Sequence, residues 1–273
     1  MKLENVIKKF NQNNIYLCPK CREESAIKNF SLVCSNNHVY DFSKKGYIHL
    51  INNYKQTNYG ESLFLARNFI FNCGYYNKVV EVIAYILKNY NTQNIIDAGC
   101  GEGFYIKKLK EKFADTYFFG LDNSKEALSL AVKFDKENPY MLANLSSLPF
   151  RDNSINIILN ILTPANYKEF FRVLTNDGVI IKIIPNKDYL KEIRDLVGLK
   201  EYENYDTLKL VLENCEVVKK VNVKEVYVLN EESAYNFLEM TPLISNLDIN
   251  KKELAKKLTK LTVDLEILVL RKK

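Results

Sequence analysis

Four residues near the start of the chain have the types and the spacing of ligands for one metal ion. Cys18, Cys21, Cys34 and His38 form the pattern C-x2-C-x12-C-x3-H. The short first pair lets two thiolates reach the same ion, and the second pair returns across an expected hairpin with strands AIKNF and SLVCS. Because protein fills all four tetrahedral positions, the pattern predicts a structural Zn²⁺ ion and not a catalytic one. Chance clustering of small buried cysteines beside a surface histidine is the alternative.

A glycine-rich loop indicates a second site, this time for a cofactor. Asp97, Gly99, Gly101 and Gly103 stand where the apolar segment NIID meets the helical segment FYIKKL, the point at which an α/β sheet opens to a ligand. Glycines let a ligand lie close to the backbone. Asp122 ends the next apolar segment, about 20 residues on, where a carboxylate accepts both hydroxyls of a ribose. The alternatives are a tight βα turn without a ligand and, for Asp122, a helix N-cap.

These residues and the later block MLANLSSLPF resemble the motifs of the class I S-adenosylmethionine methyltransferases, over residues 90–200. The resemblance implies that the glycines pass under the methionine part of S-adenosylmethionine, that Asp122 holds its ribose, and that Asn144 and Leu145 meet its adenine. Asn144 and Asn156 stand where aspartate is usual. The Asn144 amide oxygen can still accept from the adenine amino group. NAD is the rival cofactor, but Asp97 before the loop and the GCGEG spacing favour the methyl donor.

Four stretches, in order, are similar to the 23S rRNA guanine-N1 methyltransferase family of the RlmA type. They are CSNNHVYDFSKKGYIHLI, YGESLFLARNFIFNCGYY, NILTPANYKEFFRVLTNDGVIIKIIPNKDYLKEIRDL and FLEMTPL, with Glu61 where aspartate is usual. The resemblance implies an enzyme that transfers a methyl group to N1 of a guanine in a hairpin loop of 23S ribosomal RNA, and it implies a homodimer. A base in a single-stranded loop can be turned out and bound on its Watson–Crick edge.

Asn160 and Thr163 are the expected catalytic residues. They follow the fourth strand of the expected sheet, where related enzymes place polar groups against the substrate base, and we expect them to orient guanine through its N1 and amino hydrogens. For Thr163 the alternative is a proline-punctuated loop before the helix NYKEFFRVL. His38 and His49 lie in or beside the zinc module, so no histidine is expected to accept the proton of guanine N1.

Arg67, Lys44 and Lys45 are the expected RNA-binding residues. Residues 1–60 carry nine Lys or Arg against four Asp or Glu, and hold most of the net charge of +6. Such a basic segment can attract phosphates, but the charge alone favours a solvated surface that keeps the protein soluble. Arg67 lies in the helical stretch SLFLARNFIF, where an arginine is usually solvated or ion-paired, so only the family resemblance argues for RNA contact.

The elements that must position these residues follow from the apolar periodicity. We expect an α/β fold, a class I methyltransferase Rossmann-like seven-stranded sheet with a small N-terminal zinc-binding β-hairpin module. The expected parts are a zinc-binding RNA-recognition module (1–57), a helical connector (58–90) and the methyltransferase domain (91–273). Beyond residue 200 we expect a strand pair or one long strand at CEVVKKVNVKEVYVL, helices at EESAYNFLEM and KKELAKKLTKL, and a closing strand at LTVDLEILVL.

Composition and targeting signals favour a cytoplasmic location. Three of the six cysteines fall in residues 18–34, which favours a metal site in a reducing compartment over a disulfide framework. The first ten residues do not resemble a secretory signal, and no apolar stretch is long enough to cross a bilayer, so no membrane partner is expected. Two alternatives remain for the function. They are a zinc-containing methyltransferase acting on a small molecule or a protein, and a non-catalytic RNA-binding relative.

Overall fold

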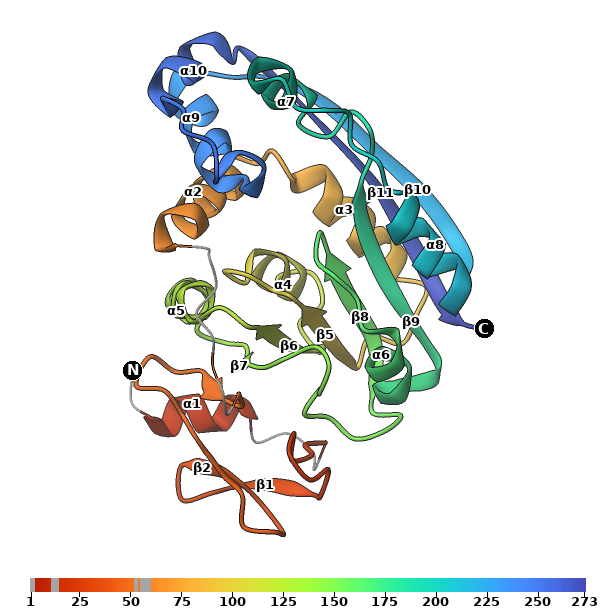
Figure 1. Cartoon of the computed structure of the whole chain (residues 1–273). Coiled ribbons are helices and arrows are strands. Elements are labelled where there is room, and N and C mark those ends of the chain that lie inside the picture. Colours follow the sequence, from red (N-terminus) through yellow and green to blue (C-terminus); the bar gives the residue numbers. More distant parts are fainter. Residues whose placement is uncertain (1–2, 11–14, 52–53, 55–59) are drawn as a thin grey trace. The chain divides into compact units, whose positions relative to one another are not determined.

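The computed structural model describes residues 3–10, 15–51, 54 and 60–273, and the chain forms two compact units (Figure 1). The first comprises Met1–Asn58 and Ala84–Ile181, and the second comprises Tyr59–Ile83 and Lys182–Lys273. The division expected from the sequence, into residues 1–57, 58–90 and 91–273, stays a prediction, because a division into compact units does not test the role of each segment. No helix in the described part of the chain is long and apolar enough to cross a membrane.

The first unit contains a largely parallel sheet. Its pairs β4–β7, β7–β6, β6–β5 and β5–β8 are all parallel. The strands are almost wholly buried and apolar, as expected when helices cover a parallel sheet. In sheet order, the strands are β4 (Ile48–His49), β7 (Tyr140–Leu142), β6 (Tyr117–Asp122), β5 (Asn94–Ala98), β8 (Ile155–Ile161) and β9 (Leu174–Pro185). The helices after β5, β6 and β8 are α4 (Phe104–Lys110), α5 (Lys125–Phe134) and α6 (Tyr167–Val173).

The N-terminal part of this unit holds the expected zinc-binding hairpin. Strands β1 (Ser25–Lys28), β2 (Ser31–Cys34) and β3 (Val39–Asp41) form an antiparallel sheet, and α1 (Leu3–Phe10) precedes them. Asn29 and Phe30 join β1 to β2 with φ angles of 46° and 63°. Positive φ at both central residues is the geometry of a type I′ turn, whose twist matches that of the strands.

Strand β4 was not expected from the sequence. It leaves the hairpin module and pairs with β7, so that the catalytic sheet gains one strand in addition to the seven expected ones, β5 to β11. Aromatic side chains pack at the base of the same module. The rings of Tyr16 and Phe150 lie 6.0 Å apart, and those of Phe119 and Phe150 lie 5.2 Å apart. Apolar burial therefore joins the zinc module to the sheet within this unit.

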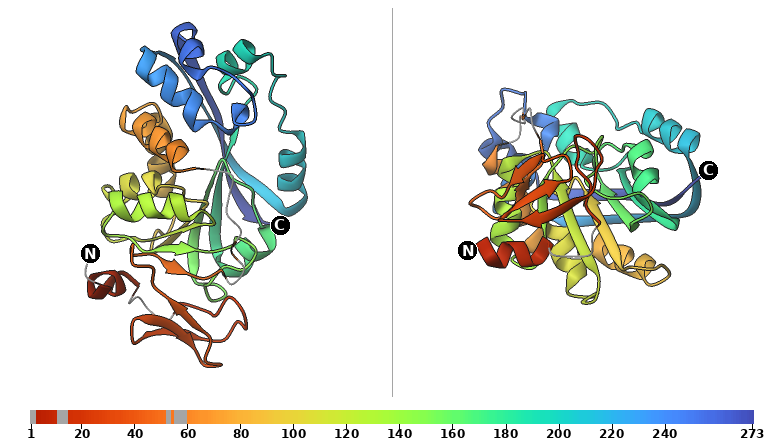
Figure 2. Two further views of the ribbon diagram at one scale, coloured as in Figure 1. Left: turned by 60° about the vertical axis from the view of Figure 1, so that its left-hand side comes forward. Right: turned by 90° about the horizontal axis from the view of Figure 1, so that it is seen from below.

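The second unit is built on a long antiparallel strand pair (Figure 2). The strand β10 (Cys215–Val228) is one long strand and pairs with β11 (Lys260–Lys272), with a register shift between Val217 and Lys219, and β11 neighbours β9. The expected helix KKELAKKLTKL ends early, because Lys260 already belongs to β11. The helices of this unit are α2 (Glu61–Asn72), α7 (Lys191–Val197), α8 (Tyr205–Asn214), α9 (Glu231–Met240), the 3₁₀ helix η1 (Pro242–Ile244) and α10 (Lys251–Lys257). Helix α3 (Asn77–Leu87) has residues in both units.

Candidate functional site

The four expected metal ligands come together in the first unit. Their ligand atoms all lie within 4.8 Å of one another. The Sγ atoms of Cys18 and Cys34 each lie 3.5 Å from His38 Nδ1, and the Cys21 and Cys34 Sγ atoms lie 3.7 Å apart. Around a tetrahedral zinc ion with Zn–S bonds of about 2.3 Å, neighbouring ligand atoms are roughly 3.5 to 3.8 Å apart. The donor set and its spacing fit a structural Zn²⁺ ion, bound by Nδ1 of the histidine.

A tyrosine that the sequence did not single out supports this metal site. The Tyr40 hydroxyl lies 3.4 Å from Cys18 Sγ. Burial raises the pKa of Cys18, but hydrogen bonds from Tyr40 and from the backbone of Cys21 and Lys20 outweigh it and lower the pKa to about 6. The thiolate is the form of cysteine that binds metal. Tyr40 therefore favours the ligand state, and only its place two residues after His38 hinted at this role.

The glycine loop lies where the sequence placed it, at the carboxyl end of β5. Asp97 is buried near the end of that strand. Gly99, Gly101 and Gly103 have φ angles of 90°, 55° and 79°, which favour glycine. The backbone N–H groups of Gly99 and Cys100 both donate to the carbonyl of Leu121 on β6, at 2.8 and 2.9 Å. The loop is thus fixed between two neighbouring strands.

Asp122 orients this loop through its carboxylate. Oδ2 accepts from Gly101 N and Oδ1 accepts from Ser124 N, both at 2.8 Å. The N-cap of α5 is Ser124, whose hydroxyl accepts from Ala127 N at 3.1 Å, so the N-cap alternative for Asp122 does not apply. A carboxylate oxygen can accept more than one hydrogen bond. The arrangement is therefore compatible with ribose hydroxyls donating to Asp122.

Two of the glycines also face bulky neighbours. A Cβ on Gly99 would lie 2.7 Å from the Thr163 Cγ2 atom, and one on Gly103 would lie 2.9 Å from the Tyr140 ring. Gly120 on β6 meets the same ring, with Cε1 at 2.5 Å from its added Cβ. Gly120 and Tyr140 were missed, because this packing joins positions on different strands. Thr163, by contrast, was expected near the site, and it lies directly over Gly99.

Asn160 belongs to β8 itself, one residue before its end, and not to the loop after the strand as expected. It is fully buried, and its amide donates to the carbonyls of Ala98 at 3.3 Å and Pro164 at 3.1 Å. Leu162 lies between Asn160 and Pro164 in the chain and is 41% exposed. Its φ of 53° is a left-handed conformation, which is strained for a residue other than glycine. These contacts make Asn160 a positioning residue for the loop. Its expected contact with guanine stays a prediction.

Asn144 and Leu145 follow β7, next to the strand that ends in Asp122. Asn144 is exposed and Leu145 is half-buried, and Ala143 N donates to the Asp122 carbonyl at 3.0 Å. Asn156 lies at the amino end of β8, away from the carboxyl ends of the strands, and its Oδ1 accepts from Asn94 N at 2.9 Å. Of the two positions that depart from aspartate, only Asn144 therefore lies near the expected cofactor site.

The expected RNA-binding residues belong to different units. Lys44 and Lys45 are exposed in the first unit, and Lys45 Nζ donates to Ser129 Oγ on α5 at 2.9 Å. Arg67 lies on α2 in the second unit, with its guanidinium 5.8 Å from the Phe64 ring centre and 5.5 Å from that of Phe71. In that unit α2 packs against α9. The family-like stretches YGESLFLARNFIFNCGYY and FLEMTPL, which contain these helices in whole or in part, therefore adjoin one another.

Comparison with known proteins decides the family. Residues 16–55 match the family model described as RlmA, N-terminal, and residues 96–181 match the methyltransferase domain model. A Bacillus subtilis protein, provisionally named a 23S rRNA (guanine-N(1)-)-methyltransferase, is 30% identical over 94% of this chain and 96% of its own length. The chain belongs to the RlmA-type 23S rRNA guanine-N1 methyltransferase family. The first matched segment contains the four metal ligands of this family member, and the second contains its glycine loop.

Two further comparisons place the family member among its relatives. The 23S rRNA (guanine(748)-N(1))-methyltransferase of Streptomyces fradiae is 24% identical over 89% of this chain and 90% of its own length. The crystal structure of the [4+2]-cyclase SpnF covers 71% of this chain and 80% of its own, with a TM-score of 0.50 and 14% identity. SpnF is named as a cyclase, so this likeness shows the class I fold and not the reaction.

Proposed function

We propose that this protein transfers the methyl group of S-adenosylmethionine to N1 of a guanine in a hairpin loop of 23S ribosomal RNA. The observation that carries the proposal is the similarity to the Bacillus subtilis relative over nearly the whole of both chains. That similarity is accompanied by matches to both the RlmA N-terminal model and the methyltransferase domain model. A methyltransferase acting on other substrates would need only the second of these.

The cofactor end of the reaction depends on the glycine loop and two strand ends. Bound S-adenosylmethionine supplies an activated methyl group, so the protein's main task is to align the acceptor atom with it. The glycine loop lets the cofactor lie against the backbone, while Gly101 and Ser124 hold the Asp122 carboxylate in place for the ribose. Asn144 and Leu145 take the adenine edge.

The acceptor end depends on the loop after β8. Asn160 ties this loop to the end of β5, and Thr163 places its hydroxyl beside Gly99, where it orients guanine through N1 or its amino group. His49 is separated from β8 by three strands. At about 4.8 Å per strand spacing that separation is roughly 19 Å, so His49 does not take the N1 proton.

The RNA is held outside the methyl-transfer site. Lys44, Lys45 and Arg67 contact phosphates, which fix the position of the RNA without specifying its sequence. We propose a cytoplasmic location, because ribosomal RNA is the proposed substrate. We also propose a homodimer, which light scattering of the purified protein tests directly by its molar mass.

Methyl transfer to unmodified 23S ribosomal RNA tests the function. The protein is incubated with S-adenosylmethionine labelled in the methyl group, and the RNA is digested to nucleosides. Labelled 1-methylguanosine is the expected product. Label that survives ribonuclease treatment of the substrate would support a small-molecule or protein acceptor instead, and RNA binding without any transfer would support a non-catalytic relative.

A further inference from the structure

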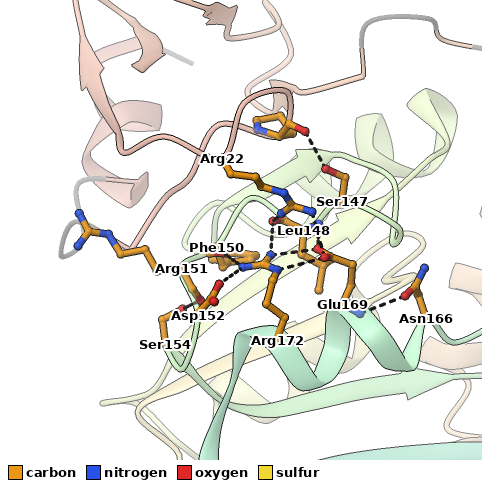
Figure 3. A network of polar contacts seen from close by, with 11 residues as sticks. Arg22, Ser147, Leu148, Phe150, Arg151, Asp152, Ser154, Asn166, Glu169 and Arg172 are labelled. Carbon is orange, nitrogen blue, oxygen red and sulfur yellow. Dashed lines mark hydrogen bonds and ion pairs between the residues drawn. The ribbon is translucent and has the colours of Figure 1, made fainter. Parts of the chain in front are cut away.

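The zinc knuckle (residues 18–22) is hydrogen-bonded to the loop that follows β7 (residues 143–150, called the adenine loop here). Ser147 Oγ donates to the carbonyl of Pro19 at 2.8 Å, and Pro19 lies between the metal ligands Cys18 and Cys21. One residue before the knuckle, Leu17 N donates to the carbonyl of Pro149 at 3.1 Å. The metal-binding turn therefore rests directly on the adenine loop, within one unit of the structure (Figure 3).

A charge network centred on the buried Glu169, and joined by the partly exposed Arg22, holds the centre of the same loop. Arg22 donates to the carbonyl of Leu148 at 3.1 Å and forms an ion pair with Glu169 Oε1 at 3.0 Å. The other Glu169 oxygen accepts from Leu148 N at 2.9 Å, and Arg172 donates to both Glu169 and Leu148. Both backbone polar groups of Leu148 are thus bound, as Figure 3 shows.

Glu169 is suited to this role because it is ionised. Burial raises the pKa of Glu169, but hydrogen bonds from Arg172 and Leu148 outweigh it and hold the pKa below its usual value. Hydrogen bonds to an ionised, largely buried group are stronger than neutral ones. The position of Leu148 is therefore set by Glu169 and Arg172 together with Arg22, which directly follows the last metal ligand of the knuckle.

The other end of the adenine loop lies at the expected cofactor site. Ser147 N donates to the carbonyl of Asn144 at 3.1 Å, and Ala143 N donates to the carbonyl of Asp122 at 3.0 Å. Between Asn144 and Ser147, which binds the knuckle, lie only Leu145, the other expected adenine contact, and Ser146. A change in the position of Ser147 therefore changes the position of Asn144.

We propose that the zinc knuckle is the outer support of the adenine loop, so that zinc binding and S-adenosylmethionine binding strengthen each other through Arg22 and Ser147. Metal binding supplies the folding free energy of a small zinc module. Without the ion the knuckle loses its fixed shape, and the cofactor must then order the adenine loop itself, which weakens its binding. The coupling is reciprocal, because cofactor that orders the loop also favours the folded knuckle. This inference rests on the cofactor site proposed above and not on the RNA substrate.

The test measures cofactor binding and metal content in the full-length, zinc-loaded protein. S-adenosylhomocysteine, the stable product of the donor, is titrated by calorimetry into the wild type and into Ser147→Ala and Arg22→Gln variants. Losing one such hydrogen bond weakens binding by about fivefold. We expect that loss for Ser147→Ala, with an unchanged content of one zinc per chain, and a larger loss for Arg22→Gln. Ser31→Ala is the control, because its hydroxyl donates to Asp41 within the hairpin.

A second measurement tests reciprocity without relying on activity. Zinc affinity is measured by competition with a chelator, with and without S-adenosylhomocysteine. In the wild type the product should raise the zinc affinity, and hydrogen exchange of residues 143–150 should slow when zinc is bound. In Ser147→Ala the rise in zinc affinity should shrink by the factor lost in product affinity.

Three results distinguish failure of the coupling, of the cofactor site and of the RNA substrate. Unchanged product affinity in both variants, with normal binding by the wild type, overturns the coupling. A zinc-loaded wild type that does not bind S-adenosylhomocysteine overturns the cofactor site and the coupling with it. Normal coupling without methylation of ribosomal RNA leaves this inference standing and overturns only the RNA substrate.

Discussion

Gly99 has two separate reasons to lack a side chain. Its φ of 90° is unfavourable for other residues, and an added Cβ would overlap the side chain of Thr163. We therefore expect Gly99→Ala to lower the free energy of unfolding by about 2 to 4 kcal/mol. Because Thr163 must also move, product affinity and turnover should both fall. Urea denaturation, calorimetric titration with S-adenosylhomocysteine and a methyl-transfer assay measure the three effects.

Gly198 provides a matched control for this substitution. It has a φ of 68°, but nothing lies within 4 Å of an added Cβ. Gly198→Ala should therefore destabilise the protein only through backbone strain, by about 1 kcal/mol. An equal loss of stability in both variants would show that the overlap with Thr163 has no effect.

Asn160 should affect turnover through the loop that it holds. In Asn160→Ala the carbonyls of Ala98 and Pro164 lose their donor, and Thr163 is no longer fixed over Gly99. A small displacement of reacting groups lowers the rate by about tenfold to a hundredfold. We expect kcat to fall by this factor. The affinity for S-adenosylhomocysteine should change by less than about threefold, which is less than the loss of one hydrogen bond would cause.

The control for Asn160 is Asn94→Ala. The Asn94 amide also donates to a backbone carbonyl, that of Ser154 at 3.0 Å, but at the amino end of β5, away from the glycine loop. It should lower stability and leave kcat unchanged. If Asn160→Ala also leaves kcat unchanged, the loop after β8 does not position the acceptor.

At the scale of elements, two roles at the start of α5 belong to different residues. Ser124 caps the helix, and Asp122 is the expected ribose ligand. Ser124→Ala removes the N-cap and should lower the free energy of unfolding by about 1 kcal/mol. The backbone N–H of Ser124 still donates to Asp122, so the affinity for S-adenosylhomocysteine should hardly change. Asp122→Ala should weaken that affinity by at least tenfold, since it removes hydrogen bonds to a charged group. Thermal unfolding and calorimetry distinguish the two, and similar losses of affinity would argue against Asp122 as the ribose ligand.

Strong local patterns predicted most elements, and weak or long-range ones did not. The apolar run before the glycine loop indicated β5, and the run ending in Asp122 indicated β6, as found. Strand β4 has two residues, too few to show any periodicity, and its partner β7 lies about ninety positions later in the chain. The packing of Tyr140 against Gly103 and Gly120 likewise depends on which strands are neighbours. One sequence does not contain that information in a local form.

In the whole molecule, the contact between the zinc module and the expected cofactor site could not be predicted from the sequence either. The metal ligands and the glycine loop were each predicted from spacing within a short segment. The contact of the knuckle with the adenine loop runs through Arg22 and Glu169, which are separated by 147 positions, and nothing in either local sequence pattern indicates that they pair. Their ion pair follows from packing that only the folded chain specifies. The zinc module was therefore predicted as a separate part, although its knuckle contacts the catalytic segment closely.

RNA binding is a property of the whole molecule, because the expected phosphate-binding residues are spread over both units. Replacing Lys44 and Lys45 together by Ala should weaken binding of a 23S RNA hairpin alike for cognate and altered loop sequences. The slope of log affinity against log salt should fall by about 1.4, that is about 0.7 for each phosphate of single-stranded RNA that the protein no longer neutralises. S-adenosylhomocysteine affinity should not change.

Lys252→Ala with Lys257→Ala removes the same charge from the exposed side of α10 and serves as the control. An equal reduction of the slope in both double variants would mean that net charge alone attracts the RNA, and that Lys44 and Lys45 bind no particular phosphate.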